Sequence, residues 1–243
     1  PASPKWSRRP ALLRLLRTLA TAVLSAALAA DAAAEDVRIA AAADLAPAQA
    51  ALSAGFKTAS GLNAQFVTGS SGILARQIDN GAPYDVFLSA NETFIRDLAA
   101  KDKVVPDSVK NYATGRLAWF SARSVTSLRD LPKAKFIAIA NPAHAPYGVA
   151  AKQALTALGL WERVSRRIVL AENARQAFAY AESRNADVAI TAWSILKPAG
   201  GALIDAKLHA PIRQTAGVIS ASRRQAAARK FLEFLLSPQG QQI

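Results

Sequence analysis

Gly69, Ser70, Ser71 and Gly72 form a hydroxyl-rich turn between an apolar strand pattern and a helical pattern. The first N–H groups of a helix have no partner inside the helix and carry a partial positive charge, so a helix start can hold an anion. The glycines let the backbone approach a ligand closely, and the serine hydroxyls add donors. Neutral donors suit a fully ionised oxyanion, which offers only acceptors. The alternative is a plain turn in which a serine caps the helix.

Three other loops also connect the end of an apolar strand pattern to a helix start. They are residues 43–44, 141–148 and 171–174, which follow strands expected over 37–42, 136–140 and 167–170. Ligands of open α/β sheets bind outside the carboxyl ends of the strands. We therefore expect these loops and the serine turn to converge on one cleft.

The elements that position these loops alternate along the chain. In a first series, strands over 37–42, 62–67 and 85–89 alternate with helices over 47–58, 73–80 and 93–101. In a second series, strands over 116–120, 136–140, 167–170 and 187–192 alternate with helical segments over 127–131, 147–158 and 174–183. A strand over 217–220 and an amphipathic helix over 222–236 end the chain. This order predicts two α/β lobes with mostly parallel sheets flanked by helices. We expect crossings near residues 112–116 and 213–217, and a cleft that closes by hinge motion.

Residues 1–34 have the order of a secretory signal peptide. Five cations precede an apolar run over 18–30, and two Ala-x-Ala cleavage choices follow it. The apolar run is too short to span a membrane. The alternative is a basic amphipathic anchor helix. We predict a cleaved signal over 1–34 and a protein that works outside the cytoplasm.

Composition excludes several function classes. The chain has no cysteine, so a disulfide, a thiolate metal site and a catalytic thiol are all excluded. Its two histidines, His144 and His209, make no metal-ligand cluster, and we expect His144 to be structural. The net charge of +13 favours anionic partners, but the cations are scattered and no nucleic-acid motif occurs. The turn lacks the Gly-x-Ser-x-Gly spacing of a hydrolase, so we expect the protein not to be an enzyme. We also expect it to have no cofactor and no nucleic-acid partner.

Five segments carry a resemblance to a known family. They are VRIAAAADLAPAQAALSAGFKTASG, SSGILARQIDNGAPYDVFLSAN, IANPAHAPYGVAAKQAL, AENARQAFAYAE and SPQGQQI. Over nearly all of residues 37–243 the chain resembles the periplasmic molybdate-binding proteins of ABC importers (ModA type), most specifically at GAPYDVFLSA. The resemblance implies a two-lobed periplasmic binding protein fold of type II, with lobe one over 35–114 and 217–243 and lobe two over 115–216. It implies a periplasmic monomer that captures molybdate or tungstate and delivers it to a membrane permease.

The resemblance also implies a ligand set. The family's second-loop serine falls on Ser71, with Ser70 beside it, and two backbone amides fall on Tyr147 and Ala174. Two positions depart from the pattern. Asp44 stands where the best-known members have a serine, and Ala192 stands where they have a tyrosine. The Tyr147 hydroxyl is a candidate replacement for that tyrosine.

Asp44 is the more consequential departure, because an ionised carboxylate that touches a dianion repels it. We expect its side chain to cap the following helix through the Ala46 amide, while its own backbone N–H faces the cleft. We also expect a helix cap at Glu172 or Asn173. The alternatives at Asp44 are a site rebuilt around the carboxylate or a different ligand, such as sulfate, phosphate, a phosphonate or a ferric complex. The scattered tyrosines argue against the ferric complex.

Overall fold

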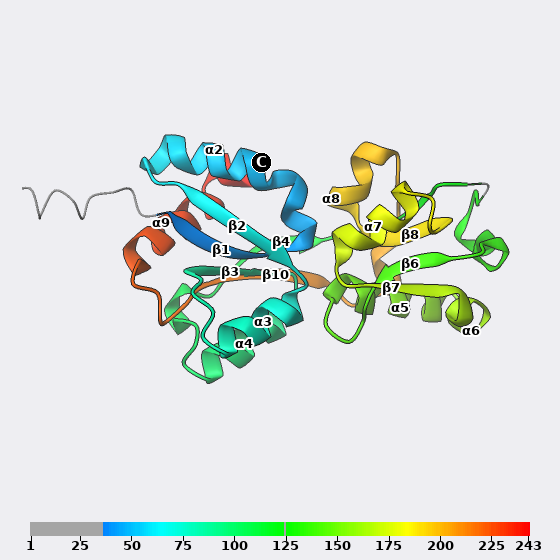
Figure 1. Ribbon diagram of the computed structural model, residues 1–243, viewed down its shortest axis with the longest axis horizontal. Helices are drawn as coiled ribbons and strands as arrows, with labels where there is room; N and C mark the ends of the chain where they lie inside the picture. Colours follow the sequence, from blue (N-terminus) through cyan, green and yellow to red (C-terminus); the bar gives the residue numbers. More distant parts are fainter. Residues whose placement is uncertain (1–35, 124) are drawn as a thin grey trace, which may run out of the picture. The chain divides into compact units, whose positions relative to one another are not determined.

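The computed structural model describes residues 36–123 and 125–243, so the signal peptide predicted over 1–34 lies outside the described residues. The described chain forms two five-stranded sheets, each flanked by helices (Figure 1). The sheets correspond to two lobes, and the predicted two-lobed α/β fold is confirmed. Among the described residues, no helix is long and apolar enough to cross a membrane.

The first sheet has the strand order β2-β1-β3-β10-β4. Its strands are β1 (Val37–Ala42), β2 (Ala64–Gly69), β3 (Val86–Ser89), β4 (Lys110–Gly115) and β10 (Ile212–Val218). β1 pairs in parallel with β2 and β3, whereas β10 runs antiparallel to β3 and β4. The helical elements of this lobe are η1 (Ala43–Ala48), α2 (Gln49–Ser60), α3 (Ser71–Asp79), α4 (Glu92–Ala100), η2 (Pro106–Ser108), α9 (Gln225–Leu236) and α10 (Pro238–Gln242).

Both faces of the first sheet are buried, which explains why β1 and β3 are largely apolar. Val37 and Ile39 of β1 pack with α2 and α9, whereas Ala40 packs with α3 and α4. A strand covered on two faces has no solvent side that would call for polar residues. Each fully buried valine or isoleucine side chain contributes about 1.5–3 kcal/mol to folding. The apolar strands therefore hold the loops at their carboxyl ends in fixed positions.

The second sheet has the order β7-β6-β8-β5-β9. Its strands are β5 (Leu117–Ser121), β6 (Ile137–Ala140), β7 (Ile168–Ala171), β8 (Val188–Ala192) and β9 (Ala202–Leu203). Its helical elements are η3 (Leu128–Lys133), α5 (Pro146–Ala157), α6 (Trp161–Val164), η4 (Ser165–Arg167), α7 (Ala174–Glu182), α8 (Trp193–Leu196), η5 (Lys197–Ala199) and η6 (Ala206–Leu208). β6 is parallel to β7 and β8, and β5 is antiparallel to β8.

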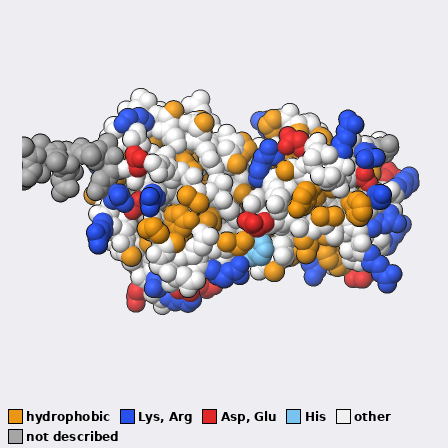
Figure 2. Space-filling model, in the orientation of Figure 1, with side chains coloured by type: hydrophobic (Ala, Val, Ile, Leu, Met, Phe, Trp, Pro, Cys, Tyr) orange, Lys and Arg blue, Asp and Glu red, His pale blue; other side chains and the backbone are white. Residues whose placement is uncertain are grey.

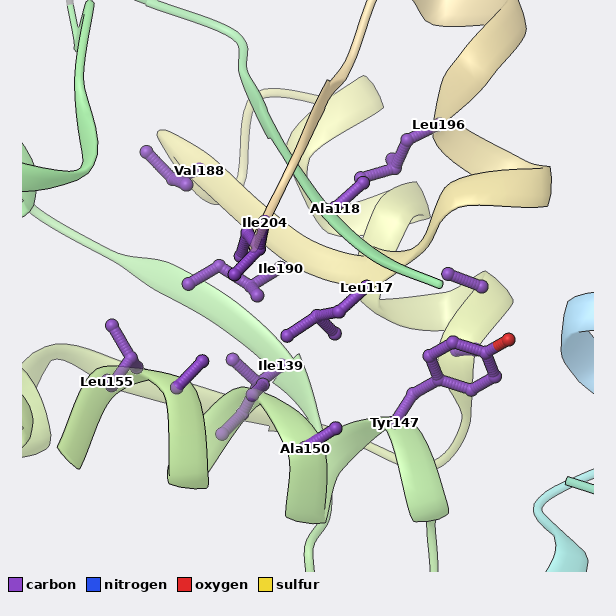
Figure 3. Close-up of a cluster of buried hydrophobic side chains, with 14 of the residues drawn as sticks. Leu117, Ala118, Ile139, Tyr147, Ala150, Leu155, Val188, Ile190, Leu196 and Ile204 are labelled. Carbon is purple, nitrogen blue, oxygen red and sulfur yellow. The ribbon is translucent and has the colours of Figure 1, made fainter. Parts of the chain in front are cut away.

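The core of the second lobe lies between its sheet and α5. Leu117, Ile139 and Ile190 of the sheet pack against Leu155 of this helix. Figure 3 shows Tyr147 at one end of this cluster, with its hydroxyl directed away from the aliphatic side chains. The aromatic ring is thus held by the core while its polar end is free for another contact.

Two strands of the first sheet differ from the sequence-based expectation. β4 was not predicted, because it is an edge strand in which only Tyr112 is buried. β10 begins at Ile212 rather than 217, because its first half carries Arg213, Gln214 and Thr215 within a largely buried strand. Residues 212–216, which the sequence had assigned to lobe two, pair with β3 and β4 of the first sheet.

Cationic side chains are spread over the surface in separate groups. In Figure 2 the lysine and arginine side chains on the visible face are interrupted by white and hydrophobic areas. Several of these cations form exposed ion pairs, such as Lys101 with Asp79 and Arg229 with Asp107. Exposed ion pairs contribute little to stability. The visible face therefore offers no continuous basic stripe of the kind that nucleic-acid-binding surfaces use.

Candidate functional site

A small cavity lies where the carboxyl ends of β1, β2 and β3 meet the starts of α5 and α7. It is lined by Ala42, Ala43, Asp44, Gly69, Ser70, Ser71, Ala90, Ala145, Pro146, Tyr147 and Ala174. Five of the six predicted site residues, Asp44, Ser70, Ser71, Tyr147 and Ala174, are brought together there. The sixth, Ala192, does not line the cavity and is fully buried in the second core. The cavity holds about 10 Å³, near the lower limit for a single water, so it must widen to hold a larger anion.

Ser71 is oriented as a hydrogen-bond donor toward this cavity. It is the first residue of α3 and is almost completely buried. Its Oγ accepts a hydrogen bond from the backbone N–H of Ala90 at 3.0 Å. That bond uses an oxygen lone pair and leaves the hydroxyl proton to be donated. A buried hydroxyl whose acceptor side is occupied suits a ligand that offers only acceptors.

Ser70 connects the two lobes instead of capping its helix. It occupies the N-cap position of α3, but its side chain makes no capping bond, so the plain serine cap is wrong. Its Oγ donates to the backbone oxygen of His144 at 2.6 Å and lies 2.8 Å from His144 Nδ1. The Gly72 N–H donates to the same His144 oxygen at 2.9 Å. His144 thus serves the contact between the lobes, as its expected structural role requires.

His144 is held in its neutral form at neutral pH. Burial lowers the pKa of its imidazole, and the positive charge of Arg76 lowers it further, while Glu172 acts in the opposite direction. Since the Ser70 proton goes to the His144 carbonyl oxygen, the neutral imidazole is placed to donate from Nδ1 to Ser70 Oγ. The serine and the histidine then satisfy each other across the cleft.

Tyr147 and Ala174 present backbone N–H groups at two helix starts. Tyr147 is the second residue of α5, after Pro146, and Ala174 is the first residue of α7. N–H groups in these positions have no acceptor within their own helix. Asn173 caps α7 by accepting from the Gln176 N–H at 3.0 Å, so the cap expected at Glu172 or Asn173 lies on Asn173.

Side chains and glycines behind the two helix starts hold them in place. Thr191 Oγ1 donates to the Ala174 carbonyl oxygen at 3.0 Å, which ties α7 to β8. A Cβ on Gly148 would lie only 2.0 Å from the Ala140 oxygen, so only glycine lets α5 begin this close to β6. The two N–H groups are therefore fixed before any ligand arrives, which reduces the entropy cost of binding.

The side chain of Asp44 does not cap the following helix, so that prediction is wrong. η1 has no side-chain cap, and Asp44 is 3% exposed. Its Oδ2 accepts from the Tyr147 hydroxyl at 3.2 Å and from Gln214 Nε2. Ser194 Oγ donates to the Asp44 backbone oxygen at 2.7 Å. Because the lobes enclose Asp44, its carboxyl finds donors on α5 and β10 that a local cap does not offer.

Burial controls the ionisation of this group. It raises the pKa of the Asp44 carboxyl from 3.8 to about 6, while hydrogen bonds from Gln214 and Tyr147 act in the opposite direction. Burial, with the Asp44 charge as the next cause, also raises the pKa of Tyr147 well above its ordinary value. The Tyr147 hydroxyl therefore remains a donor to Asp44. It is not available as a simple replacement for the tyrosine absent at Ala192.

A second pocket lies on the other side of the Asp44–Tyr147 contact. It holds about 420 Å³, and its lining includes Asp44, Tyr112, Tyr147 and Gln214; we call it the hinge-side pocket. Asp44 and Tyr147 line both cavities, so their contact forms part of the wall between them. Within residues 36–123 and 125–243, Asp44 Oδ1 and the Tyr112 hydroxyl are buried without a hydrogen-bond partner.

The sequence did not indicate Ala90, Ser194 or Gln214 as site residues. Gln214 lies in the half of β10 that lacks a clear strand pattern, and Ser194 lies in the short helix α8 that begins directly after β8. Ala90 lies within the most specific part of the resemblance, and that was the available signal for it. Among the described residues, no group of three or more histidine, cysteine, aspartate or glutamate side chains is placed to hold a metal ion.

Comparison with known proteins agrees with this geometry. The family model of bacterial extracellular solute-binding proteins matches residues 37–243. The molybdate-binding protein ModA of Rhodobacter capsulatus is 33% identical over 239 residues, covering 94% of both chains. The periplasmic molybdate-binding protein of Azotobacter vinelandii superposes with a TM-score of 0.79 at 31% identity, covering 84% of this chain and 94% of that one. The sulfate-binding protein SubI of Mycobacterium tuberculosis, at 16% identity and a TM-score of 0.68, covers 84% of this chain and 83% of its own and shares the fold.

Proposed function

The chain belongs to the family of bacterial extracellular solute-binding proteins, and from that premise we propose that it captures molybdate or tungstate for an ABC importer. The observation that carries the proposal is the convergence of Ser71 with the starts of α5 and α7 on one cavity between the lobes. All of these groups are neutral donors, which match an oxyanion that carries only acceptors. The 33% identity to a molybdate-binding protein over 94% of the chain supports the choice of anion.

In this proposal the protein binds its cargo and performs no chemistry on it. Lobe one contributes the Ser71 hydroxyl and the Asp44 backbone N–H, and lobe two contributes the N–H groups of Tyr147 and Ala174. An anion held by both lobes has a higher affinity for the closed form, so it shifts the population toward closure. The membrane permease then recognises the closed protein.

We further propose that the protein acts in the periplasm as a monomer, after removal of a signal peptide.

The crossing points between the lobes lie at Arg116 and between Leu203 and Ile212, where the chain passes from one sheet to the other. Each lobe then presents half of the binding site.

Titration calorimetry on residues 36–243 with molybdate, tungstate, sulfate and phosphate tests the proposal. We expect one-to-one binding of the first two anions, with sulfate weaker by orders of magnitude. Binding of sulfate or phosphate alone would reassign the cargo to another oxyanion, and Asp44 and Ala192 would be the first residues to examine. If none of the four anions binds, the proposed role in oxyanion binding is contradicted.

Replacing Ser71 by alanine is expected to weaken molybdate binding by about 10- to 100-fold, because a hydrogen bond to a charged group contributes about 1.5–3 kcal/mol. The measurement is the molybdate Kd by calorimetry. Ser70→Ala is the matched control, since the Ser70 hydroxyl donates to His144 rather than toward the cavity. Equal losses in the two variants would contradict the assignment of Ser71 as the donor.

A further inference from the structure

We propose that Asp44 and the captured oxyanion share one proton. The Asp44 carboxyl takes up this proton from solvent when the anion binds, and its Oδ1–H then donates a hydrogen bond to an anion oxygen. No covalent bond to the anion forms or breaks. The inference rests on the proposed function, because it requires an oxyanion in the cavity that Asp44 lines.

The two oxygens of Asp44 have different surroundings that match the two oxygens of a carboxylic acid. Oδ2 accepts from both Tyr147 and Gln214, as a carbonyl oxygen does. Oδ1 is buried and has no partner among the described residues. A protonated Asp44 therefore keeps both existing hydrogen bonds at Oδ2 and gains a donor at Oδ1. An ionised Asp44 instead places its own negative charge beside the anion, which repels it.

No cationic side chain of the described chain pairs with Asp44, and the side chains that face it are neutral. α5 contributes the Tyr147 hydroxyl and β4 contributes Tyr112, whose pKa lies well above its ordinary value through burial and through the Asp44 charge. α8 and β10 contribute the neutral Ser194 and Gln214.

The cations on neighbouring elements are engaged elsewhere or exposed. Arg116 lines the hinge-side pocket but is exposed. On the helices packed against η1, Lys57 of α2 bonds to the Gly61 oxygen and Arg175 of α7 pairs with Glu182. No salt bridge to Asp44 occurs within the described residues, so a proton is the available counter-charge.

The consequence is that capture depends on pH. Burial already raises the Asp44 pKa to about 6 without an anion, and a dianion in the neighbouring cavity raises it further. Between these two pKa values, binding takes up about one proton, and Kd rises about tenfold per pH unit. Below the lower pKa and above the upper pKa, Asp44 has the same protonation state with and without the anion, so its titration no longer changes Kd with pH. The protein therefore binds its anion most tightly on the acidic side of neutrality.

Calorimetry of molybdate binding in two buffers of different ionisation enthalpy, at about pH 7, measures the proton uptake directly. We expect close to one proton per anion for the unmodified protein. Asp44→Asn carries an amide in place of the carboxylic acid and cannot titrate. We expect it to show no uptake and to bind molybdate at least about tenfold more tightly than the unmodified protein at about pH 8.

Glu172→Gln is the matched control, because it removes an exposed carboxylate next to the start of α7 and should keep the uptake. Molybdate binding without proton uptake by the unmodified protein would overturn the inference and leave the proposed function standing. The same uptake in Asp44→Asn as in the unmodified protein would also overturn it. Absence of binding heat at every pH would instead mark failure of the proposed function.

Discussion

Gly72→Ala is expected to weaken molybdate binding by at least about 100-fold while leaving the lobes folded. A Cβ at this position would lie 2.8 Å from the His144 backbone oxygen and 3.0 Å from its Cβ, both on the opposite lobe. A backbone oxygen cannot rotate away, so the lobes must separate. Separation breaks the bonds from Gly72 N and Ser70 Oγ to His144, each of which contributes about 0.5–1.5 kcal/mol. The remainder of the loss is the strain of the close contact.

Calorimetry gives the affinity of the Gly72 variant, and thermal unfolding without ligand tests whether the fold survives. Gly72 lies inside the first turn of α3, where alanine favours the helix by about 0.5–1 kcal/mol. This gain offsets part of the hydrogen bonding lost to His144, so the unfolding temperature should fall only slightly. Gly69→Ala is the matched control, because its Cβ would meet only the Leu74 side chain, at 3.4 Å or more, and its loss should be much smaller. Wild-type affinity in Gly72→Ala would show that the cleft binds anion without this closure.

The second large effect concerns stability without ligand. We expect the stability advantage of Asp44→Asn over the unmodified protein to grow by about 2 kcal/mol as the pH rises from about 4 to about 6.5. The Asp44 pKa is about 6 in the folded protein and near 3.8 in the unfolded chain. Between these values the folded state binds more protons, so the stability of the unmodified protein falls as pH rises. Above about pH 7 the carboxyl is ionised in both states and the difference is constant. Urea unfolding at a series of pH values measures it.

Tyr147→Phe serves as the companion variant for this experiment. It keeps the Asp44 carboxyl but removes one of the hydrogen bonds that lower its pKa. The folded-state pKa should therefore be higher in Tyr147→Phe, so the pH range over which stability falls should extend further upward while it still begins near pH 3.8. A stability difference between Asp44→Asn and the unmodified protein that does not vary with pH would show that Asp44 is not buried as described.

The parts of the site that the sequence predicted are those set by local pattern. The strand expected over 37–42 matches β1 residue for residue, and the helices after the cleft loops begin within two residues of their expected positions. Where a parallel strand ends and the following helix begins, the connecting loop lies at the carboxyl edge of the sheet. This rule predicted the loops that line the cavity, whereas Tyr147 and Ala174 were assigned from the family resemblance.

The surroundings of Asp44 could not be predicted in this way, because its partners are distant in sequence. Tyr147 is 103 residues away, Ser194 is 150 and Gln214 is 170. From local sequence alone, an aspartate before a helical pattern is well explained as a cap. Only closure of the two lobes brings an uncharged donor set around the carboxyl. Ala192 shows the same limit, because an aligned position does not establish that the residue lines the cavity.

The placement of β10 determines the order in which the lobes can be completed. The second sheet uses only residues 117–203, so all its strands are present once that stretch of the chain has been synthesised. The first sheet lacks the strand between β3 and β4 until residues 212–218 arrive. Until then β3 has an open edge, and open edges favour pairing with other chains. The lobe whose strands are synthesised first is thus the last to be completed.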